Sequence, residues 1–280
     1  MYEREIPQFD LRKITDSGQS FRMRETAPGE FEVVARDRVL RMLDRGGSRY
    51  AFSCGEDEFR TIWVPYFDLE TDYGAFCHLA PPSDRFLSRA LRFGDGLRIL
   101  RQDPWEMLIT FLISQRKNIP AIRSSVERLC QRFGEPIGGG ENVRYAFPTP
   151  AALVERSAEE LAACSLGYRT EYVRSAARMV AQGELDLCRA ASLSDRELLD
   201  LLMTIPGVGP KVANCILLFG FHRIAAFPRD VWINRVIDRE YGGDFPLERY
   251  DGCAGVIQQY LFYYARSGSR ADAAVVGESC

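Results

Sequence analysis

The segment 205–213, with the sequence IPGVGPKVA, constrains the fold more than any other part of the chain. A leucine-rich stretch at 197–204 leads into its Gly-x-Gly turn, and an apolar stretch leaves from Pro210. This pattern predicts two helices joined by a hairpin, because glycines permit a tight turn and proline favours the first turn of a helix. Such a turn exposes backbone N–H groups beside a helix N-terminus, where they bind a phosphate without any side-chain charge.

Two side chains close to this turn are of types that can take part in a reaction. Lys211 falls in the first turn of the second helix, and Asp230 precedes a further helical stretch. The helix dipole disfavours a positive charge there and burial would add to this, so both effects favour a neutral amine that can attack carbon. Asp230 could stabilise positive charge on a sugar or relay a proton. Two alternatives stay open, a solvated lysine paired with phosphate and a carboxylate that only caps its helix.

Composition excludes several classes of protein. Of the 280 residues, 46% are hydrophobic and 27% are charged, which is ordinary for a globular protein. No apolar run reaches membrane-spanning length and the charged N-terminus does not resemble a signal peptide, so we expect a cytoplasmic protein, associated with the nucleoid in a prokaryote. The net charge of −3 argues mildly against a nucleic-acid partner. The 8 cysteines are scattered without a Cys-x-x-Cys pair, so we expect no structural metal and no catalytic metal.

Periodicity divides the chain into a short β region and a long helical one. Residues 31–35, 38–43 and 50–53 alternate around turn signals and predict a small antiparallel sheet. Start signals at Asp103-Pro104 and at Ser194 then open helices, the second being the first hairpin helix. Further helices are expected over 119–133, 151–164, 168–181, 230–241 and 246–266, and a flexible glycine loop over 138–140.

The predicted fold class is α+β and mostly α. We expect an N-terminal antiparallel β domain with its following helices over 1–95, and a helical domain over 96–266 that contains the hairpin at 195–220. Residues 267–280 are expected to form a frayed or disordered tail.

At 205–235 the chain resembles the helix–hairpin–helix DNA glycosylases, whose signature is a Gly/Pro-rich loop followed by an aspartate. More specifically, it resembles the 8-oxoguanine DNA glycosylases/AP lyases of this HhH-GPD superfamily. Further segments match that family in its own order and cover nearly the whole chain. They are residues 17–22, 100–104, 126–130, 166–169, 254–258 and 261–262.

The resemblance implies a small β domain packed on a helical HhH-GPD body, and an enzyme of base-excision repair. The partner would be duplex DNA that contains 8-oxoguanine, with the damaged nucleotide flipped out of the helix. Lys211 would attack the sugar C1′, expel the base and form a Schiff base, after which β-elimination nicks the strand. Asp230 would support the oxocarbenium-like transition state. No cofactor and no obligate protein partner are implied.

The resemblance also implies a base pocket. The Gly18 carbonyl would accept the N7 hydrogen of 8-oxoguanine, which guanine lacks. Gln258 would bond the Watson–Crick edge, and Phe262 and Cys215 would enclose the base. Each has a simpler alternative, since Gly18 could serve a turn and the other three could be ordinary helical packing residues.

Tyr168 matches the family's wedge into the gap that the flipped nucleotide leaves. Arg169 is expected to reach a phosphate, although a solvated arginine is the alternative. Gly207 and Gly209 would approach a phosphate, and a monovalent cation often bridges this contact in the family.

Three positions depart from the animal enzymes. Arg116 replaces the asparagine that fills the DNA gap, Ala121 replaces an arginine that reads the orphaned cytosine, and Trp232 replaces a phosphate-contacting histidine. We expect Arg116 and Trp232 to contact DNA. The departures lead to the hypothesis that this chain discriminates the opposite base less strictly than the animal enzymes.

Two other functions fit the hairpin. One is a monofunctional alkylpurine glycosylase of the 3-methyladenine type, in which Asp230 assists water and Lys211 is structural. The other is a non-catalytic DNA-binding module, because the same hairpin occurs in many DNA binders.

Overall fold

Five strands near the N-terminus form one antiparallel sheet in the order β1-β5-β4-β3-β2. The sheet predicted from the alternating segments is confirmed, whereas β1 and β2 were not predicted because charged residues interrupt their alternation. The strands are β1 (Tyr2–Glu5), β2 (Met23–Ala27), β3 (Glu30–Ala35), β4 (Arg38–Asp44) and β5 (Arg49–Phe52). The structure, a computed structural model, describes residues 1–138 and 143–277, with side chains described as far as Gly268.

One face of this sheet carries its own hydrophobic core. Val33 lies opposite both Met23 and Leu40, and Met42 lies opposite both Phe31 and Phe52. All of these side chains are buried, because alternate residues of a strand point to the same face. They pack with residues of the short helix α1 (Leu11–Asp16) and of the π-helical turn η1 (Phe59–Trp63).

Helices make up most of the remaining chain, which confirms the predicted α+β, mostly helical class. The one additional sheet in the described chain is the short pair β6 (Pro136–Ile137) and β7 (Arg144–Tyr145). The helices are α2 (Glu56–Glu58), α3 (Val64–Tyr66), α4 (Tyr73–Cys77), α5 (Arg85–Phe93), α6 (Pro104–Ser114), α7 (Ile119–Phe133), α8 (Pro150–Val154), α9 (Ala158–Ala162), η3 (Gly167–Arg169), α10 (Thr170–Ala181), α11 (Leu187–Ala190), α12 (Asp195–Met203), α13 (Pro210–Phe219), α14 (Val231–Glu240), η4 (Leu247–Tyr250) and α15 (Ala254–Gly277).

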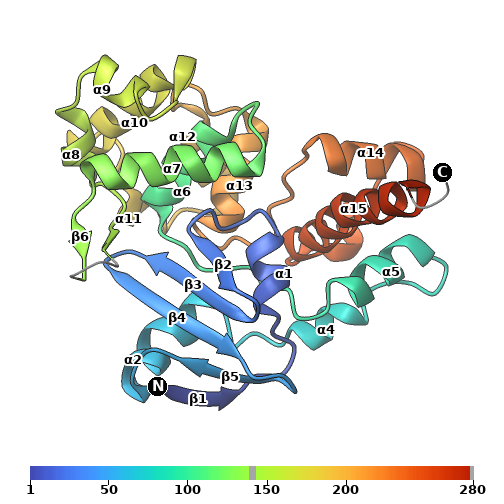
Figure 1. Ribbon diagram of the computed structural model, residues 1–280. Coiled ribbons are helices and arrows are strands. Elements are labelled where there is room, and N and C mark those ends of the chain that lie inside the picture. The colour runs from blue at the N-terminus through green and yellow to red at the C-terminus, as the bar shows by residue number, and fades with distance from the viewer. Residues whose placement is uncertain (139–142, 278–280) are drawn as a thin grey trace.

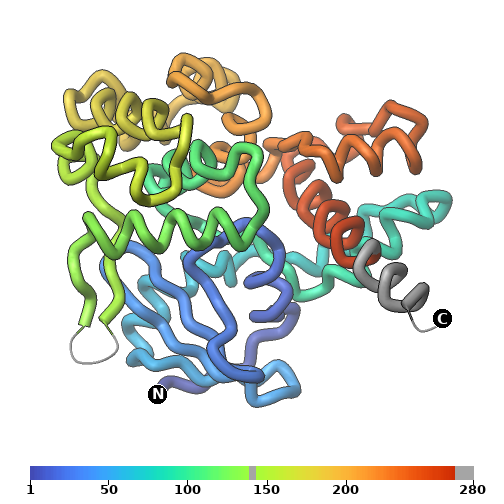
Figure 2. Tube along the Cα trace, turned by 45° about the horizontal axis from the view of Figure 1, so that its top comes forward, coloured from blue at the N-terminus to red at the C-terminus, as the bar shows by residue number. Residues whose placement is uncertain are grey.

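The helices form two groups, which Figures 1 and 2 show from different angles. One group lies above the sheet and contains α6, α7, α10, α12 and α13. The other lies beside it and contains α4, α5, α14 and α15. Contacts of α13 with α6 and α12, and of α15 with α5 and α14, hold each group together. The chain between α13 and α14 passes from one group to the other.

Local chemistry explains where predicted helices differ from observed ones. The helix expected over 151–164 is two helices, because Ser157 and Glu160 form a capping box that starts α9 anew. The helix expected over 246–266 begins only at Ala254, since Gly252 has φ +77°, which an α-helix does not accommodate.

Three predictions concern the ends and loops of the chain. Helix α15 runs to Gly277, into the segment expected as a tail, and residues 278–280 lie outside the described residues. Residues 139 and 140 of the predicted glycine loop also lie outside them. Within the described chain, no helix is both long and apolar enough to cross a membrane.

Candidate active site

One cavity lies where α13, the start of α14, α15 and the loop after α1 meet, and its volume is about 60 Å³. Six of the residues predicted for the site line it, although they come from four separate parts of the sequence. These six are Gly18, Lys211, Cys215, Asp230, Gln258 and Phe262. The structure therefore brings together the proposed nucleophile, the carboxylate and the base-binding residues between the two helix groups.

The hairpin that carries Lys211 forms as the sequence predicts. Helix α12 begins at a capping box of Ser194 and Glu197. Gly207 has φ +87°, a backbone conformation that favours glycine, and Gly209 is the N-cap of α13 without any side-chain cap. The first N–H groups of α13 therefore have no side-chain partner and remain able to bind an anion.

Lys211 is the second residue of α13, and it is exposed. Its Nζ atom lies 5.9 Å from the centroid of the Phe111 ring. That ring is stacked on Phe219, with the two centroids 5.6 Å apart. The amine thus lies beside an apolar wall of the cavity. Because the residue as a whole is exposed, the burial that the sequence argument invoked for Lys211 is not found.

Asp230 caps α14, because its Oδ1 accepts a hydrogen bond of 2.8 Å from the backbone N–H of Ile233. Burial raises the pKa of this carboxyl, while the Ile233 N–H and the positive charge of Lys211 lower it. Burial prevails, so the pKa lies above its usual value. Capping and chemistry are compatible here, since the same carboxylate that caps α14 also lines the cavity.

Cys215 lies one helical turn after Lys211 and is 4% exposed. Burial raises the pKa of its thiol, while Lys211 lowers it and the charge of Asp230 raises it again. The thiol is therefore neutral at ordinary pH and presents a polarisable apolar surface to the cavity.

Gln258 is 4% exposed on α15, and its Oε1 has no hydrogen-bond partner in the part of the chain that is described. A buried acceptor without a partner costs about 1–3 kcal/mol. Phe262 follows one turn later on the same face. The unpaired acceptor and the ring together offer a polar edge and a flat wall.

Gly18 is tightly enclosed in the loop after α1. It has φ +78°, and a Cβ atom there would lie 3.1 Å from Ile119 Cδ1 and 3.4 Å from Phe262 Cε1. The loop is fixed by Gln259 Nε2, which donates to the Ser17 carbonyl at 2.8 Å. Both the conformation and the space favour glycine at this position.

The residues predicted to contact DNA differ in exposure. Arg116 is exposed, Tyr168 is 54% exposed, and Trp232 is partly exposed beneath the guanidinium of Arg235. Arg169 is only 7% exposed, and it donates hydrogen bonds to backbone carbonyls of the protein. In this structure Arg169 therefore does not face solvent, as a phosphate contact would require.

Sequence reasoning missed four lining residues, Phe111, Phe219, Pro228 and Gln259. A signal existed for Phe219, because it continues the four-residue spacing of Lys211 and Cys215. No such signal existed for Phe111, since almost every residue of α6 is buried and its helix has no polar face.

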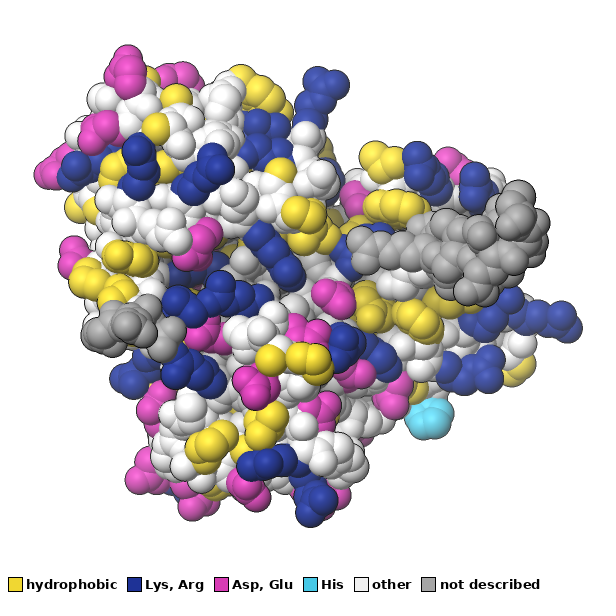
Figure 3. Space-filling view, in the orientation of Figure 1, with side chains coloured by type: hydrophobic (Ala, Val, Ile, Leu, Met, Phe, Trp, Pro, Cys, Tyr) yellow, Lys and Arg dark blue, Asp and Glu magenta, His cyan; other side chains and the backbone are white. Residues whose placement is uncertain are grey.

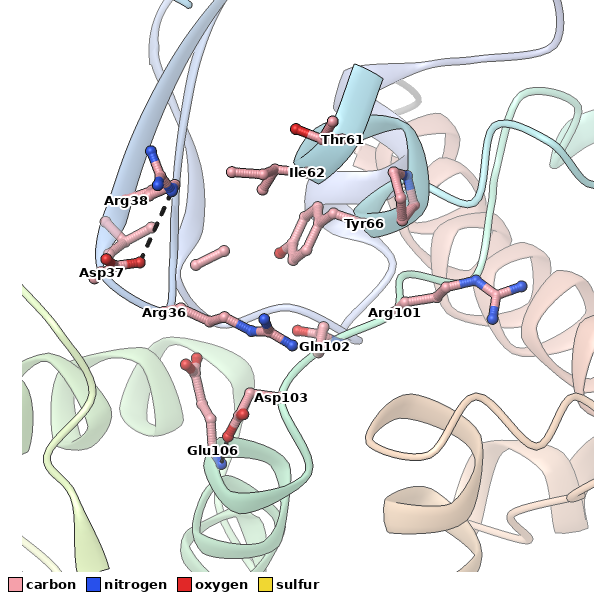
Figure 4. Close-up of a pocket in the computed structure, with 13 residues that line it drawn as sticks. Arg36, Asp37, Arg38, Thr61, Ile62, Tyr66, Arg101, Gln102, Asp103 and Glu106 are labelled. Atoms are coloured by element: carbon pink, nitrogen blue, oxygen red, sulfur yellow. Dashed lines mark hydrogen bonds and ion pairs between the residues drawn. The ribbon is translucent and has the colours of Figure 1, made fainter. Parts of the chain in front are cut away.

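A larger cavity of about 460 Å³ lies between the β3–β4 turn, α3 and the start of α6. Figure 4 shows Arg36 from the turn close to Asp103 and Glu106 of the α6 start. Burial raises the pKa of Glu106 to about 7, opposed by Arg22, whose Nη1 lies 3.7 Å from the carboxylate. The lining contains no lysine or cysteine, so we assign the chemistry to the smaller cavity.

Charge on the surface is uneven despite the net negative total. In the view of Figure 3, Lys and Arg side chains extend across the middle of the face and over the right-hand helix group. Asp and Glu side chains lie at the upper left and, among further Lys and Arg side chains, toward the sheet at the bottom. Among the described residues, no group of three or more His, Cys, Asp or Glu residues is arranged to hold a metal ion.

Comparisons with known proteins agree with this geometry. Residues 2–108 match the model of the 8-oxoguanine DNA glycosylase N-terminal domain, and residues 109–245 match that of the HhH-GPD superfamily of base excision DNA repair proteins. The two matches meet within α6, and the division predicted after residue 95 stays a prediction.

Individual relatives extend over most of the chain. A probable N-glycosylase/DNA lyase of Methanothermobacter thermautotrophicus is 31% identical over 74% of each chain. The N-glycosylase/DNA lyase of Saccharomyces cerevisiae is 33% identical, and the match spans 67% of this chain but only 53% of the yeast protein. The 8-oxoguanine glycosylase/lyase of Clostridium acetobutylicum, solved with DNA that carries cytosine opposite 8-oxoguanine, has a TM-score of 0.88 at 34% identity and covers 95% of this chain and 94% of its own.

Proposed function

We propose, on the premise that this chain belongs to the 8-oxoguanine DNA glycosylase family of HhH-GPD base excision DNA repair proteins, that it excises 8-oxoguanine from duplex DNA and nicks the resulting abasic strand. The observation that carries the proposal is the convergence of Lys211, Asp230 and the unpaired Gln258 Oε1 on one cavity. An amine, a carboxylate and an unsatisfied acceptor suit a base that is bound by its edge while its sugar reacts.

Lys211 is the proposed nucleophile. Its Nζ attacks C1′ of the extruded nucleotide, the glycosidic bond breaks, and the base leaves with the bonding electron pair and then takes up a proton. The sugar ring opens to a Schiff base on Nζ, and loss of a C2′ proton expels the 3′ phosphate. The carboxylate of Asp230 stabilises the positive charge that develops on the sugar.

Recognition of the base is assigned to the walls of the cavity. Gln258 Oε1 accepts from the Watson–Crick edge, the Gly18 carbonyl accepts from N7–H, and Phe262 and Cys215 enclose the ring. The cavity is much smaller than the roughly 300–1,000 Å³ of ordinary ligand pockets. Side chains such as Phe262 must therefore move when the base enters.

DNA is held at the hairpin. The N–H groups around Gly207 and Gly209 bind a phosphate, and the carbonyls of the same turn suit a bridging monovalent cation. The Gly207 carbonyl already accepts from Gln115 Nε2 at 3.1 Å and retains a second lone pair. Trp232 and Tyr168 face the duplex beside it. We place the enzyme with the DNA of the cell, in the cytoplasm, and on the nucleoid if the source is a prokaryote.

Weak discrimination of the opposite base is part of the proposal. Ala121 has no side-chain donor for a base edge, and the exposed Arg116 makes no hydrogen bond or ion pair within the described chain. Excision rates opposite C, A, G and T should therefore lie within about tenfold of one another, since Ala121 offers no donor where the animal enzymes read the orphaned cytosine. A steep preference for C would contradict this.

The test uses a duplex with one 8-oxoguanine and an end label, assayed with and without alkali. The wild type should nick the strand without alkali, and Lys211→Gln should release no base. Arg196→Gln removes the same charge from an exposed site on α12 and should match the wild type. Base release that needs alkali for strand cleavage would indicate the alkylpurine type of enzyme, and binding without release would indicate a non-catalytic module.

A further inference from the structure

Two adjacent residues at the end of η3 occupy opposite environments. Tyr168 is 54% exposed, whereas Arg169 is 7% exposed. An arginine is seldom buried unless its donors are used. The hydrogen-bond acceptors of Arg169 therefore indicate which parts of the protein this buried side chain holds together.

All the hydrogen bonds of the Arg169 guanidinium within the described chain go to backbone carbonyls. Nε donates to the Gln115 carbonyl at 2.8 Å, and Nη2 donates to the same oxygen. Nη1 donates to the Leu166 carbonyl at 3.0 Å. The guanidinium carbon also lies 4.3 Å from the centroid of the Tyr168 ring. One planar group thus contacts both the Tyr168 ring and the segment that follows α6.

That segment carries Arg116 between two fixed neighbours. Gln115 is held by Arg169 through its carbonyl, and its side chain donates to Gly207 of the hairpin at 3.1 Å. Lys117 Nζ donates to the Ser165 carbonyl at 2.5 Å. Arg116 itself has φ +52°, a conformation that is unfavourable for a residue with a Cβ and persists only where its surroundings impose it.

The same surface continues to the phosphate-binding turn. A Cβ on Gly207 would lie 2.5 Å from the Tyr172 ring, so this ring packs directly on the turn. The Tyr172 and Tyr168 rings are 6.0 Å apart in an edge-to-face arrangement. Arg116, Tyr168 and the hairpin therefore belong to one connected set of contacts, with Arg169 at its buried centre.

We propose that Arg169 is a positioning residue that fixes the Arg116 backbone and the Tyr168 ring relative to each other, so that both exposed side chains enter the duplex gap as one preorganised unit. This inference rests on the proposed function and replaces the direct phosphate contact expected from the sequence. Flipping a nucleotide breaks stacking, and a ring and a guanidinium plane restore part of it. Holding them in place beforehand avoids ordering them at the moment of extrusion.

The experiment compares two rates in the same duplex, excision of 8-oxoguanine and nicking at a preformed abasic site, under single-turnover conditions. Only the first requires a base to be extruded. Arg169→Lys keeps the charge and loses the planar fork, so excision should fall tenfold or more relative to nicking. Arg174→Gln, which removes an exposed ion pair with Glu171 on α10, is the matched control and should leave both rates unchanged.

A second variant tests whether Arg169 acts through Arg116. Adding Arg169→Lys to Arg116→Ala should lower excision less than Arg169→Lys does alone, because the side chain that it positions is already gone. The inference would be overturned if Arg169→Lys lowered both rates equally, or if the effects of the two substitutions on excision were fully additive. It would also be overturned if Arg169→Lys reduced the salt dependence of DNA binding by about one phosphate contact. A wild-type protein that excises no 8-oxoguanine would instead overturn the proposed function, and the two failures are thereby distinguished.

Discussion

Two clusters in this molecule each contain a carboxylate beside a cationic side chain, but the pKa of the carboxyl is lowered in one and raised in the other. At the junction of the β domain and the helices, Asp68 is 2% exposed, and both of its carboxylate oxygens have partners. His222 Nε2 lies 3.3 Å from Oδ2, Tyr73 donates to the same oxygen at 3.0 Å, and Arg101 Nη2 lies 2.8 Å from Oδ1. Burial alone would raise the pKa of Asp68. The hydrogen bonds and charges of His222 and Arg101 outweigh burial and lower the pKa to about 2.

Asp230 also lies beside a cation, but its hydrogen bonds to backbone N–H groups and the charge of Lys211 do not offset its burial, so its pKa stays above the usual value. The neighbouring Gln258 Oε1 is buried without a partner. The comparison teaches that residue types alone do not identify a reactive site. A buried polar group without a hydrogen-bond partner beside a cavity is a better indicator of such a site, because a substrate can supply the missing interaction.

The largest effect should come from Asp230→Asn, which tests the reactive side of this comparison. Asparagine caps a helix as well as aspartate does, so stability should be unchanged, whereas base release should fall by about 10²–10⁴-fold with the loss of the charge. Asp186→Asn makes the same change at the cap of α11 and is the control. Single-turnover excision measures the rates, and activity within a few-fold of the wild type would place Asp230 with the structural carboxylates.

Asp68→Asn tests the structural side. Because the pKa is lowered from 3.8 to about 2, the ionised carboxylate stabilises the fold above pH 4, and this contribution is lost as the pH falls toward 2. The variant should lose about 2 kcal/mol of stability at pH 7 and less than about 0.5 kcal/mol at pH 2, where the carboxyl of the folded protein is half protonated, while its excision rate per folded molecule stays normal. Urea unfolding at several pH values measures this. A cost that does not change with pH would show that packing, not charge, is responsible.

A smaller effect should separate the two hairpin glycines. Gly207→Ala requires a left-handed residue, which costs about 1–2 kcal/mol, and its Cβ would lie 2.5 Å from the Tyr172 ring. In Gly209→Ala the added Cβ meets nothing within 4 Å and φ is −97°, so only the poorer N-cap of alanine counts, at about 0.5–1 kcal/mol. Thermal unfolding and DNA-binding titrations should rank the two in this order. Equal effects would show that the turn tolerates a side chain at both positions.

Much of the fold could be predicted from the sequence because its signals are local. The helix over 119–133 has the same bounds as α7, with Asn118 as its cap, and the capping box at Ser194 opens α12. The junction cluster could not be predicted, because Asp68 and His222 are far apart in the sequence and neither lies in a motif. The burial of Arg169 was missed for the same reason, since its acceptor at Gln115 is a backbone carbonyl.

The residues that line the cavity could be predicted where the hairpin motif marked them, as for Lys211, or where the resemblance to the DNA glycosylases did, as for Cys215 on α13 and for Gln258 and Phe262 on α15. The apolar wall of Phe111 could not, because a helix buried on all sides gives no indication of which residue meets a cavity.

Reduction with borohydride during turnover of an 8-oxoguanine duplex tests the central claim most directly, because it converts a Schiff base into a stable amine. Peptide mapping of the trapped protein should find the sugar adduct on Lys211. An adduct on either of the other lysines, Lys13 or Lys117, or base release with no adduct at all, would contradict the account.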